Sequence, residues 1–240
     1  MSRFFVSPFA GDVARLTGQE AHHVARVLRM RVGEELVLCD GVGTDYVCRI
    51  TAVSDSDVEA QVLYRRPSES EPTVAVTLYQ GLPKSEKMEL IVQKCVEIGI
   101  TRIVPVAMSR SIVKLSQSEG AKKAARWQKI AASAAEQSGR GIVPVVEEPI
   151  SFKQLLSAVA EENTITFYEG GGVPLAEIVN SETKSVSLVI GPEGGFEAEE
   201  VESLRAAGAH VATLGPRILR CETAPLVALA VVMQLTGNMN

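Results

Sequence analysis

The stretch that decides the fold begins with Val186-Ser187-Leu188-Val189-Ile190 and continues with Gly191-Pro192-Glu193-Gly194-Gly195-Phe196. The first five residues form a short apolar run, which is typical of a strand buried on both faces of a parallel sheet. The glycines that follow predict a turn whose backbone can approach a ligand closely. A helix is expected over 197–207, and its free N–H groups would point back at this turn. We therefore expect a ligand-binding loop at the carboxyl end of a buried strand.

From Thr73 onward the sequence alternates between runs typical of strands and runs typical of helices. Strands are expected at Val74–Tyr79, Arg102–Val106, Val143–Glu147, Thr164–Tyr168, Val186–Ile190 and His210–Thr213. Helices are expected from Ser85, as the N-terminal cap, to Gly99, as the C-terminal cap, and near 119–138, 151–160, 197–207 and 223–236. This alternation predicts an α/β domain with a mostly parallel sheet that is covered by helices on both faces.

Residues 1–70 read mostly as strands that are separated by Gly- and Ser-containing turns. The strands are expected at Glu35–Cys39, Asp45–Val53 and Val58–Tyr64. One helix is expected after Thr17, because Thr17 and Glu20 have the spacing of a capping box. Its apolar face would carry Ala21, Val24, Val27 and Leu28. This pattern predicts a small β-barrel over 1–70, followed by a polar linker with two prolines and a second domain over 73–240.

Charge is distributed unevenly along the chain. The net charge of -5 by itself disfavours a nucleic-acid partner. The excess of acid, however, belongs mainly to residues 151–240, whereas Arg102 to Arg140 contains eight basic residues and only two acidic ones. A second basic patch, Arg26, Arg29 and Arg31, lies on the expected N-terminal helix. Either patch alone is most simply a solvated helix face, but two patches in separate domains favour a polyanion-binding site.

Several classes of protein are disfavoured. No apolar run reaches the roughly 18 to 20 residues that cross a bilayer, and the start has no apolar stretch of signal-peptide length, so a cytoplasmic protein is expected. The four cysteines and three histidines lack the spacing of a zinc site, so we expect no metal, and His22 and His23 are interpreted as helix-face residues. No segment matches the phosphate-binding loop of NTPases or the dinucleotide-binding fingerprint, which removes the main support for an NAD-dependent oxidoreductase.

Three loops follow expected strands in the last third of the chain: 168–172, 191–196 and 214–224. Each is Gly-containing, and each alone is more often a simple turn than a ligand site. Together, Gly191–Gly195 and Leu214–Ala224 closely resemble the signatures of the ribosomal small-subunit methyltransferase E family. Its members belong to the knotted SPOUT superfamily and methylate N3 of one uridine in 16S rRNA.

The resemblance extends over essentially the whole chain. Residues 22–31 look like the start of the family's PUA-like RNA-binding domain, and 84–89, 93–99 and 135–140 are similar to later signatures. One departure is Cys221, where the family commonly has Thr, and we expect no loss of activity from it. The resemblance implies a PUA-like β-barrel over 1–70 and a SPOUT α/β domain over 73–240 with a deep trefoil knot. It also implies a homodimer and an S-adenosylmethionine site within about 165–225.

Carried over by motif, the resemblance implies candidate residues for each role. The cofactor-pocket candidates are Tyr168, Ile190, Gly191, Glu193, Gly195, Leu214, Ile218 and Leu219. Arg220 would stabilise charge on the uracil carbonyls or orient a phosphate, and Glu222 would accept a proton or fix the arginine. Glu222 is equally well explained as an anion that stabilises a helix N-terminus. The candidates for contact with 16S rRNA in the 30S subunit are Arg26, Arg29, Arg31, Lys84, Lys87, Arg110, Arg126 and Arg140.

Two alternatives stay open from the sequence. A non-catalytic RNA-binding or ribosome-assembly factor on the same architecture would have no reason to keep all three loops. A SPOUT methyltransferase with a different RNA target, such as a tRNA ribose, is disfavoured only through the resemblance of the N-terminal domain.

Overall fold

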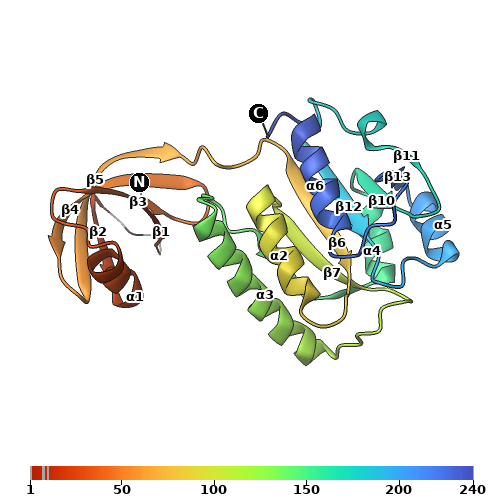
Figure 1. The fold of residues 1–240 in the computed structure, drawn as a ribbon, viewed down its shortest axis with the longest axis horizontal. Helices are drawn as coiled ribbons and strands as arrows, with labels where there is room; N and C mark the ends of the chain where they lie inside the picture. Colours follow the sequence, from red (N-terminus) through yellow and green to blue (C-terminus); the bar gives the residue numbers. More distant parts are fainter. Residues whose placement is uncertain (1, 7–8, 10, 240) are drawn as a thin grey trace. The chain divides into compact units, whose positions relative to one another are not determined.

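A computed structural model describes residues 2–6, 9 and 11–239. The chain divides into two compact units (Figure 1). The first unit contains residues 1–71 together with 135–143, and the second contains 72–134 together with 144–240. Residues 135–143 thus belong to the first unit, although the predicted division placed them in the second domain. Within the described part of the chain, no helix is both long and apolar enough to span a membrane.

The first unit is built on one five-stranded sheet. Its strand order is β1 (Arg3–Phe5), β3 (Glu35–Cys39), β4 (Thr44–Val53), β5 (Asp57–Pro67) and β2 (Val13–Thr17). Neighbouring strands are antiparallel, except that β1 runs parallel to β3. The predictions for β3, β4 and β5 are confirmed to within three residues. The inner face of the sheet carries a core that includes Phe4, Leu36, Leu38 and Ile50.

The predicted N-terminal helix differs from expectation. The chain forms a short helix α1 (Gly18–His22) that continues as a π-helix, η1 (His23–Val27), in which the Leu28 N–H bonds to the His23 carbonyl five residues back. This wider turn rotates Val27 away from the core, where it is 63% exposed, whereas Val24 stays buried. The expected capping box is wrong, because the Thr17 side chain makes no cap hydrogen bond.

Residues 135–143 attach to the first unit through backbone hydrogen bonds. The Gly141 carbonyl accepts bonds from the Gly43 N–H and the Cys39 thiol, each at 3.1 Å. The Val143 N–H donates to the Gly41 carbonyl at 3.1 Å. The segment therefore extends the hydrogen bonding of the first unit beyond its own strands.

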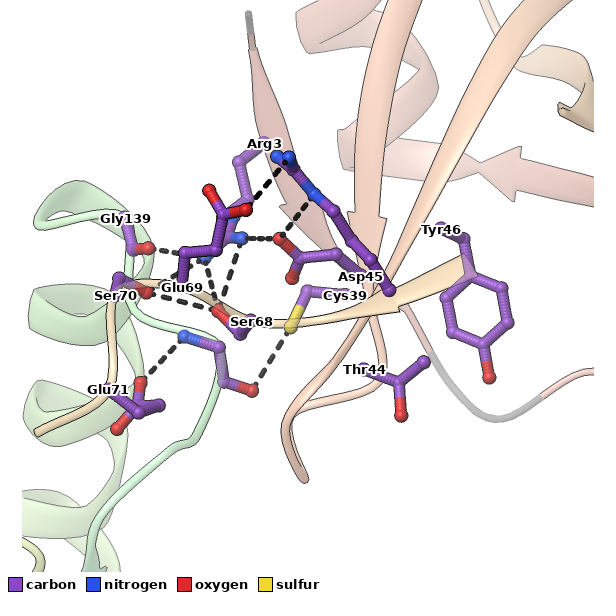
Figure 2. Close-up of polar contacts among 12 residues, drawn as sticks. Arg3, Cys39, Thr44, Asp45, Tyr46, Ser68, Glu69, Ser70, Glu71 and Gly139 are labelled. Carbon is purple, nitrogen blue, oxygen red and sulfur yellow. Dashed lines mark hydrogen bonds and ion pairs between the residues drawn. The ribbon is translucent and has the colours of Figure 1, made fainter. Parts of the chain in front are cut away.

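Charged side chains reinforce this attachment (Figure 2). The Arg3 guanidinium bonds to the Gly139 carbonyl and pairs with Asp45, which is only 1% exposed. Glu71 pairs with Arg140 at 2.6 Å and accepts the Gly141 N–H at 2.8 Å. Arg140 is 3% exposed, so it has little surface for the predicted contact with RNA. Its burial beside Glu71 instead gives it a structural role.

The second unit is a parallel sheet, as predicted. Its strand order is β11 (Val173–Pro174), β13 (His210–Thr213), β10 (Thr164–Phe167), β12 (Ser185–Ile190), β6 (Ala75–Gly81), β7 (Arg102–Ala107) and β8 (Val145–Val146), with β9 (Ile150–Ser151) also beside β7. Every described pairing in this sheet is parallel.

Helices connect these strands (Figure 1). They are α2 (Lys87–Ile98), α3 (Gln117–Gln137), α4 (Phe152–Val159), the short η2 (Leu175–Glu177), α5 (Ala198–Ala206) and α6 (Ala224–Leu235). Helix α6 packs on α2, β6 and β12, whereas α4 packs on α5 and β7. Val104 and Val106 of β7 form a core with Leu155 of α4 and Leu204 of α5. The buried Ile103, which directly precedes Val104 in β7, points to the opposite face of the sheet.

The caps of α2 follow the prediction only at its C-terminal end. Gly99 adopts a left-handed conformation, with φ of 117°, and closes the helix as expected. At the other end, Glu86 and not Ser85 is the N-cap residue. Ser85 has a φ of 56°, so the turn before α2 is tight and brings Lys84 and Lys87 close to the second Gly-rich loop.

Candidate functional site

The three Gly-containing loops meet at one cavity of about 890 Å³ in the second unit. They follow β10, β12 and β13, which lie in one parallel sheet, so their carboxyl ends share one edge. The volume is within the usual range for sites that bind small molecules. The lining includes all eight predicted cofactor residues: Tyr168, Ile190, Gly191, Glu193, Gly195, Leu214, Ile218 and Leu219. Arg220 and Glu222 also line it.

Close backbone packing explains why glycine is required in this wall. A Cβ on Gly81, at the end of β6, would lie 2.6 Å from the backbone nitrogen of Pro192. A Cβ on Gly195 would lie 2.6 Å from a carboxylate oxygen of Glu169, and Gly195 has a φ of +68°. A side chain at Gly81 would therefore collide with the backbone of the second loop, and one at Gly195 would need a strained left-handed conformation and a shift of the Glu169 side chain.

Lys87 connects two walls of the cavity. Its ammonium group lies 3.2 Å from Glu193 of the second loop and 3.1 Å from Glu222 of the third loop. The backbone N–H of Lys84 adds a hydrogen bond to Glu193 at 3.0 Å. The sequence prediction placed Lys87 among the RNA contacts, but the structure places its side chain in the cavity lining.

These contacts set the charge states of the cluster. Partial burial opposes ionisation of Glu222, but hydrogen bonds from its own backbone amide, the Cys221 thiol and Lys87 outweigh it and lower its pKa. Burial and hydrogen bonding compete in the same way at Glu193, and its pKa is also lowered. The hydrogen bond to Glu222 is the main cause that raises the pKa of Lys87. The cluster therefore holds two carboxylates and one ammonium group at neutral pH.

Cys221 is a neutral thiol that contacts this cluster at Glu222. Its Sγ donates to Glu222 at 3.2 Å. Burial, followed by the hydrogen bond to Glu222, raises the pKa of Cys221 to about 12. A thiol can donate this hydrogen bond as a hydroxyl would, which agrees with the expectation that Cys at this position preserves the site.

The third loop also carries exposed groups. Arg220 is exposed where it lines the cavity, and its carbonyl accepts the backbone N–H groups of Thr223 and Ala224 at 2.8 and 2.9 Å. These bonds form the turn that leads into α6. Ile218 is 86% exposed, which leaves an apolar surface that a bound ligand would cover.

The predicted RNA contacts fall into two groups. Arg26, Arg29, Arg31 and Lys84 are exposed, although Arg26 also forms an exposed ion pair with Asp55. Lys87, Arg110, Arg126 and Arg140 instead pair with carboxylates: Glu193 and Glu222, Glu197, Glu89, and Glu71, respectively. These partners are distant in sequence, so counting charges along the chain could not find them.

Metal binding has no visible basis in the described part of the chain. Within it, no group of three or more His, Cys, Asp or Glu side chains has an arrangement that could hold a metal ion. Two carboxylates of the cavity, Glu193 and Glu222, are instead paired with Lys87.

Comparisons with known proteins agree with this architecture. Residues 69–233 match the family described as RNA methyltransferase domain, and residues 16–63 match the RNA methyltransferase PUA domain. The chain is 39% identical to the ribosomal RNA small subunit methyltransferase E of Bacillus subtilis, with 98% of this chain and 97% of that protein covered.

Two solved structures are similar over nearly the whole chain. One is a ribosomal RNA small subunit methyltransferase E from Neisseria gonorrhoeae bound to S-adenosyl methionine, with a TM-score of 0.86, 34% identity and 98% of both chains covered. The other is a Legionella pneumophila methyltransferase in complex with the same cofactor, with a TM-score of 0.83, 31% identity, and 97% and 96% of the two chains covered. The mixed α/β fold, with a PUA-like domain and a methyltransferase domain, and the extent of these matches show that the chain belongs to the ribosomal RNA small subunit methyltransferase E family.

Proposed function

We propose that this protein transfers a methyl group from S-adenosylmethionine to N3 of one uridine in the 16S rRNA of the 30S subunit. The observation that carries the proposal is the convergence of three Gly-containing loops on one cavity, whose wall also holds the Lys87–Glu222 pair. Membership of the methyltransferase E family supports the reaction type and the class of RNA.

The cavity suits S-adenosylmethionine in size and in chemistry. Its Gly-rich walls expose backbone N–H and carbonyl groups, which can bind adenine and the amino-acid end. The side chains of Ile190, Leu214 and Leu219 offer apolar surface for the purine, and Ile218 would become covered. The proposed binding set is completed by four further lining residues: Tyr168, Gly191, Glu193 and Gly195.

The cofactor supplies an electrophilic methyl group on its sulfonium. The protein must hold the uracil outside its stack, align N3 with the methyl group and remove the N3 proton. We assign Arg220 to the uracil carbonyls or to a neighbouring phosphate, since its side chain is exposed at the cavity. Glu222 is ionised and can accept a proton, and Lys87 holds it in place.

Glu222 has a second assignment that the same geometry supports. It precedes α6 (Ala224–Leu235) by two residues, where a negative charge stabilises the helix dipole. Methyl transfer at saturating cofactor separates the two roles. We expect Glu222→Gln and Arg220→Ala to lower kcat by about 100-fold or more if the residues act on the uracil. Full methyl transfer by both variants would remove Arg220 and Glu222 from the reaction.

RNA binding is assigned to exposed cations of both units. In the first unit these are Arg26, Arg29 and Arg31, and in the second they include Lys84. Each phosphate contact steepens the decrease of log affinity with log salt by about 0.7 to 0.9. Replacing the three arginines together by alanine should therefore flatten the salt dependence of binding to 16S rRNA. An unchanged slope would place the RNA elsewhere.

The proposal also includes the wider organisation that the family implies. Residues 1–70, completed by 135–143, act as the PUA-like RNA-binding domain, and the rest of 73–240 acts as a SPOUT domain whose 165–225 region forms a deep trefoil knot. The protein works as a homodimer in the cytoplasm. Light scattering of the purified protein tests the dimer, and a monomer at assay concentrations would contradict it.

One experiment tests activity, target and substrate form together. 16S rRNA from cells that lack the protein is mapped by mass spectrometry, and methylation is then restored in vitro on 30S subunits or on free rRNA. We expect one missing methyl group on uridine N3 and its restoration by the protein with S-adenosylmethionine. Calorimetry adds a check, because absence of cofactor binding would favour a non-catalytic assembly factor. A methyl group missing from another RNA would assign a different target.

A further inference from the structure

We infer that Arg110 is a positioning residue that holds the second Gly-rich loop in its cofactor-binding shape, and that it does not contact RNA. This inference rests on the proposed function, because it assigns the loop to S-adenosylmethionine. Arg110 lies in the segment after β7, which is separated in sequence from the loop at 191–197 but adjacent to it in space.

Each of the three guanidinium nitrogens of Arg110 makes one hydrogen bond to residues 194–197. Its Nε and Nη2 atoms bond to the two carboxylate oxygens of Glu197, at 2.8 and 2.9 Å. Its Nη1 atom donates to the Gly194 carbonyl at 2.9 Å. All three nitrogens therefore have a partner in the loop. A phosphate could replace these partners only by breaking a two-bond fork that fixes both position and orientation.

The stem of Arg110 also shapes the loop backbone. A Cβ on Gly194 would lie 2.9 Å from the Cβ of Arg110. The loop backbone therefore packs directly against Arg110, and glycine at position 194 allows this close approach because it has no Cβ. Removing the side chain beyond Cβ would take away all three hydrogen bonds, whereas the Cβ against which Gly194 packs would remain.

A second contact beside Arg110 makes the support rigid. The Ser109 N–H donates to one carboxylate oxygen of Glu200 at 2.9 Å, and the other oxygen accepts the Glu197 N–H at 3.0 Å. Glu200 is 5% exposed, so this bridge is buried. The Ser109–Arg110 segment therefore contacts the start of α5 through two neighbouring carboxylates. Arg110 lowers the pKa of Glu197 chiefly through their hydrogen bond, so the fork stays charged at neutral pH.

The position of Arg110 relative to the cavity defines how it acts. Residues 190–196 line the cavity, whereas Arg110 is outside the lining among the described residues. It therefore reaches a bound cofactor only through the loop. We expect its loss to weaken cofactor binding and to leave the transfer step at saturating cofactor nearly unchanged.

The test compares five variants with the wild-type protein by calorimetric titration with S-adenosylmethionine. We expect Arg110→Ala and Glu197→Gln each to raise Kd about tenfold, less than the roughly 100-fold cost of misplacing a reacting group, because the pair is partly exposed. The double variant should lose little more than either single variant, since both changes break one contact. Arg205→Ala is the matched control, because Arg205 forms an exposed ion pair on the same helix, α5, with Glu202.

Kinetics and salt dependence distinguish positioning from RNA contact. In the Arg110→Ala variant, KM for S-adenosylmethionine should rise about tenfold while kcat stays within about a factor of two. The salt slope of binding to 16S rRNA should equal that of the wild type. Arg110→Lys keeps the charge without the fork, so its Kd should lie between the wild type and Arg110→Ala. If Arg110→Ala does not fold, Arg110→Lys replaces it in the comparison of Kd and KM with the wild type.

Three results would overturn the inference. An unchanged cofactor Kd together with a salt slope flattened by about 0.7 to 0.9 would make Arg110 a phosphate contact. Equal loss in the Arg205→Ala control would show a general effect on α5. If the wild-type protein itself fails to bind S-adenosylmethionine, the proposed function is wrong, and the assignment of Arg110 fails with it.

Discussion

Replacing Lys87 by methionine removes the cation that bridges Glu193 and Glu222 and keeps a similar side-chain length. The ammonium group lies 3.2 and 3.1 Å from these carboxylates. At such distances, and with an effective dielectric constant near 20, one pair has a gross attraction of about 5 kcal/mol. Desolvation cancels most of it, and what remains contributes to the lowered pKa of each paired carboxylate.

We therefore expect the pKa of Glu222 to rise in the Lys87→Met variant, because one of the groups that lower it is removed. The hydrogen bonds from the Glu222 backbone amide and the Cys221 thiol remain and limit the rise. The sign follows from the lowered pKa of Glu222 in the folded protein. Its stabilising contribution is present above its ordinary pKa and is lost as pH falls through the lowered value, so the loss begins at higher pH in the variant.

The assay is the pH dependence of kcat for methyl transfer, at saturating S-adenosylmethionine and 30S subunits. If ionised Glu222 takes part in the reaction, the acid limb of the pH profile, where kcat falls as Glu222 is protonated, should move to higher pH in Lys87→Met. Lys94→Met is the matched control, because Lys94 lies on the same helix and pairs with Glu97 at 2.8 Å, away from the cavity lining. Its acid limb should coincide with that of the wild type.

Coincident acid limbs for Lys87→Met and the wild type would refute the reasoning. They would show either that Lys87 does not lower the pKa of Glu222 or that the reaction does not require ionised Glu222. Glu222→Gln separates these possibilities, because the limb disappears only if it belongs to Glu222.

Three further changes have specific expected outcomes. Gly81→Ala should lower Tm by about 4 to 8 °C and weaken cofactor binding, because the new Cβ would displace Pro192; an unchanged Tm by calorimetry would contradict this close contact. A fragment of residues 1–71 should lack a cooperative thermal transition by circular dichroism, and adding residues 135–143 through a flexible linker should restore it. Native protein at pH 8 should not react with a thiol reagent, since all four cysteines are buried and the pKa of Cys221 is about 12; rapid labelling before unfolding would contradict this expectation.

The strands were the most predictable part of the fold. The predicted bounds of β3 (Glu35–Cys39) and β13 (His210–Thr213) coincide with those of the structure. These runs combine β-branched side chains with polar or Gly-containing flanks, and that information is local. The π-helix at His23–Val27 could not be predicted in this way. It depends on how the chain packs after α1, and an ordinary helical period places Val27 on the wrong face.

The site was predictable to the extent that it follows from topology and motif. Loops after parallel strands share one edge of the sheet, so their convergence follows once the strands are recognised. The carboxylate partners of the basic side chains could not be predicted from topology or motif. Arg110 and Arg126 occur in a basic stretch, but folding brings Glu197 and Glu89 to them from other elements. A charge count along the chain overstates the free positive surface because it ignores such pairs.

The discontinuous first unit has a consequence for biosynthesis. Residues 1–71 leave the ribosome first, but the 63 residues of 72–134 must follow before 135–143 arrive to complete the unit. At typical bacterial rates, this interval is about 3 to 13 seconds. Until then Arg3 lacks the Gly139 carbonyl and the backbone N–H of Gly43 lacks its acceptor, Gly141. The domain that is synthesised first therefore cannot finish folding first, and its incomplete edge is open to chaperones on the nascent chain.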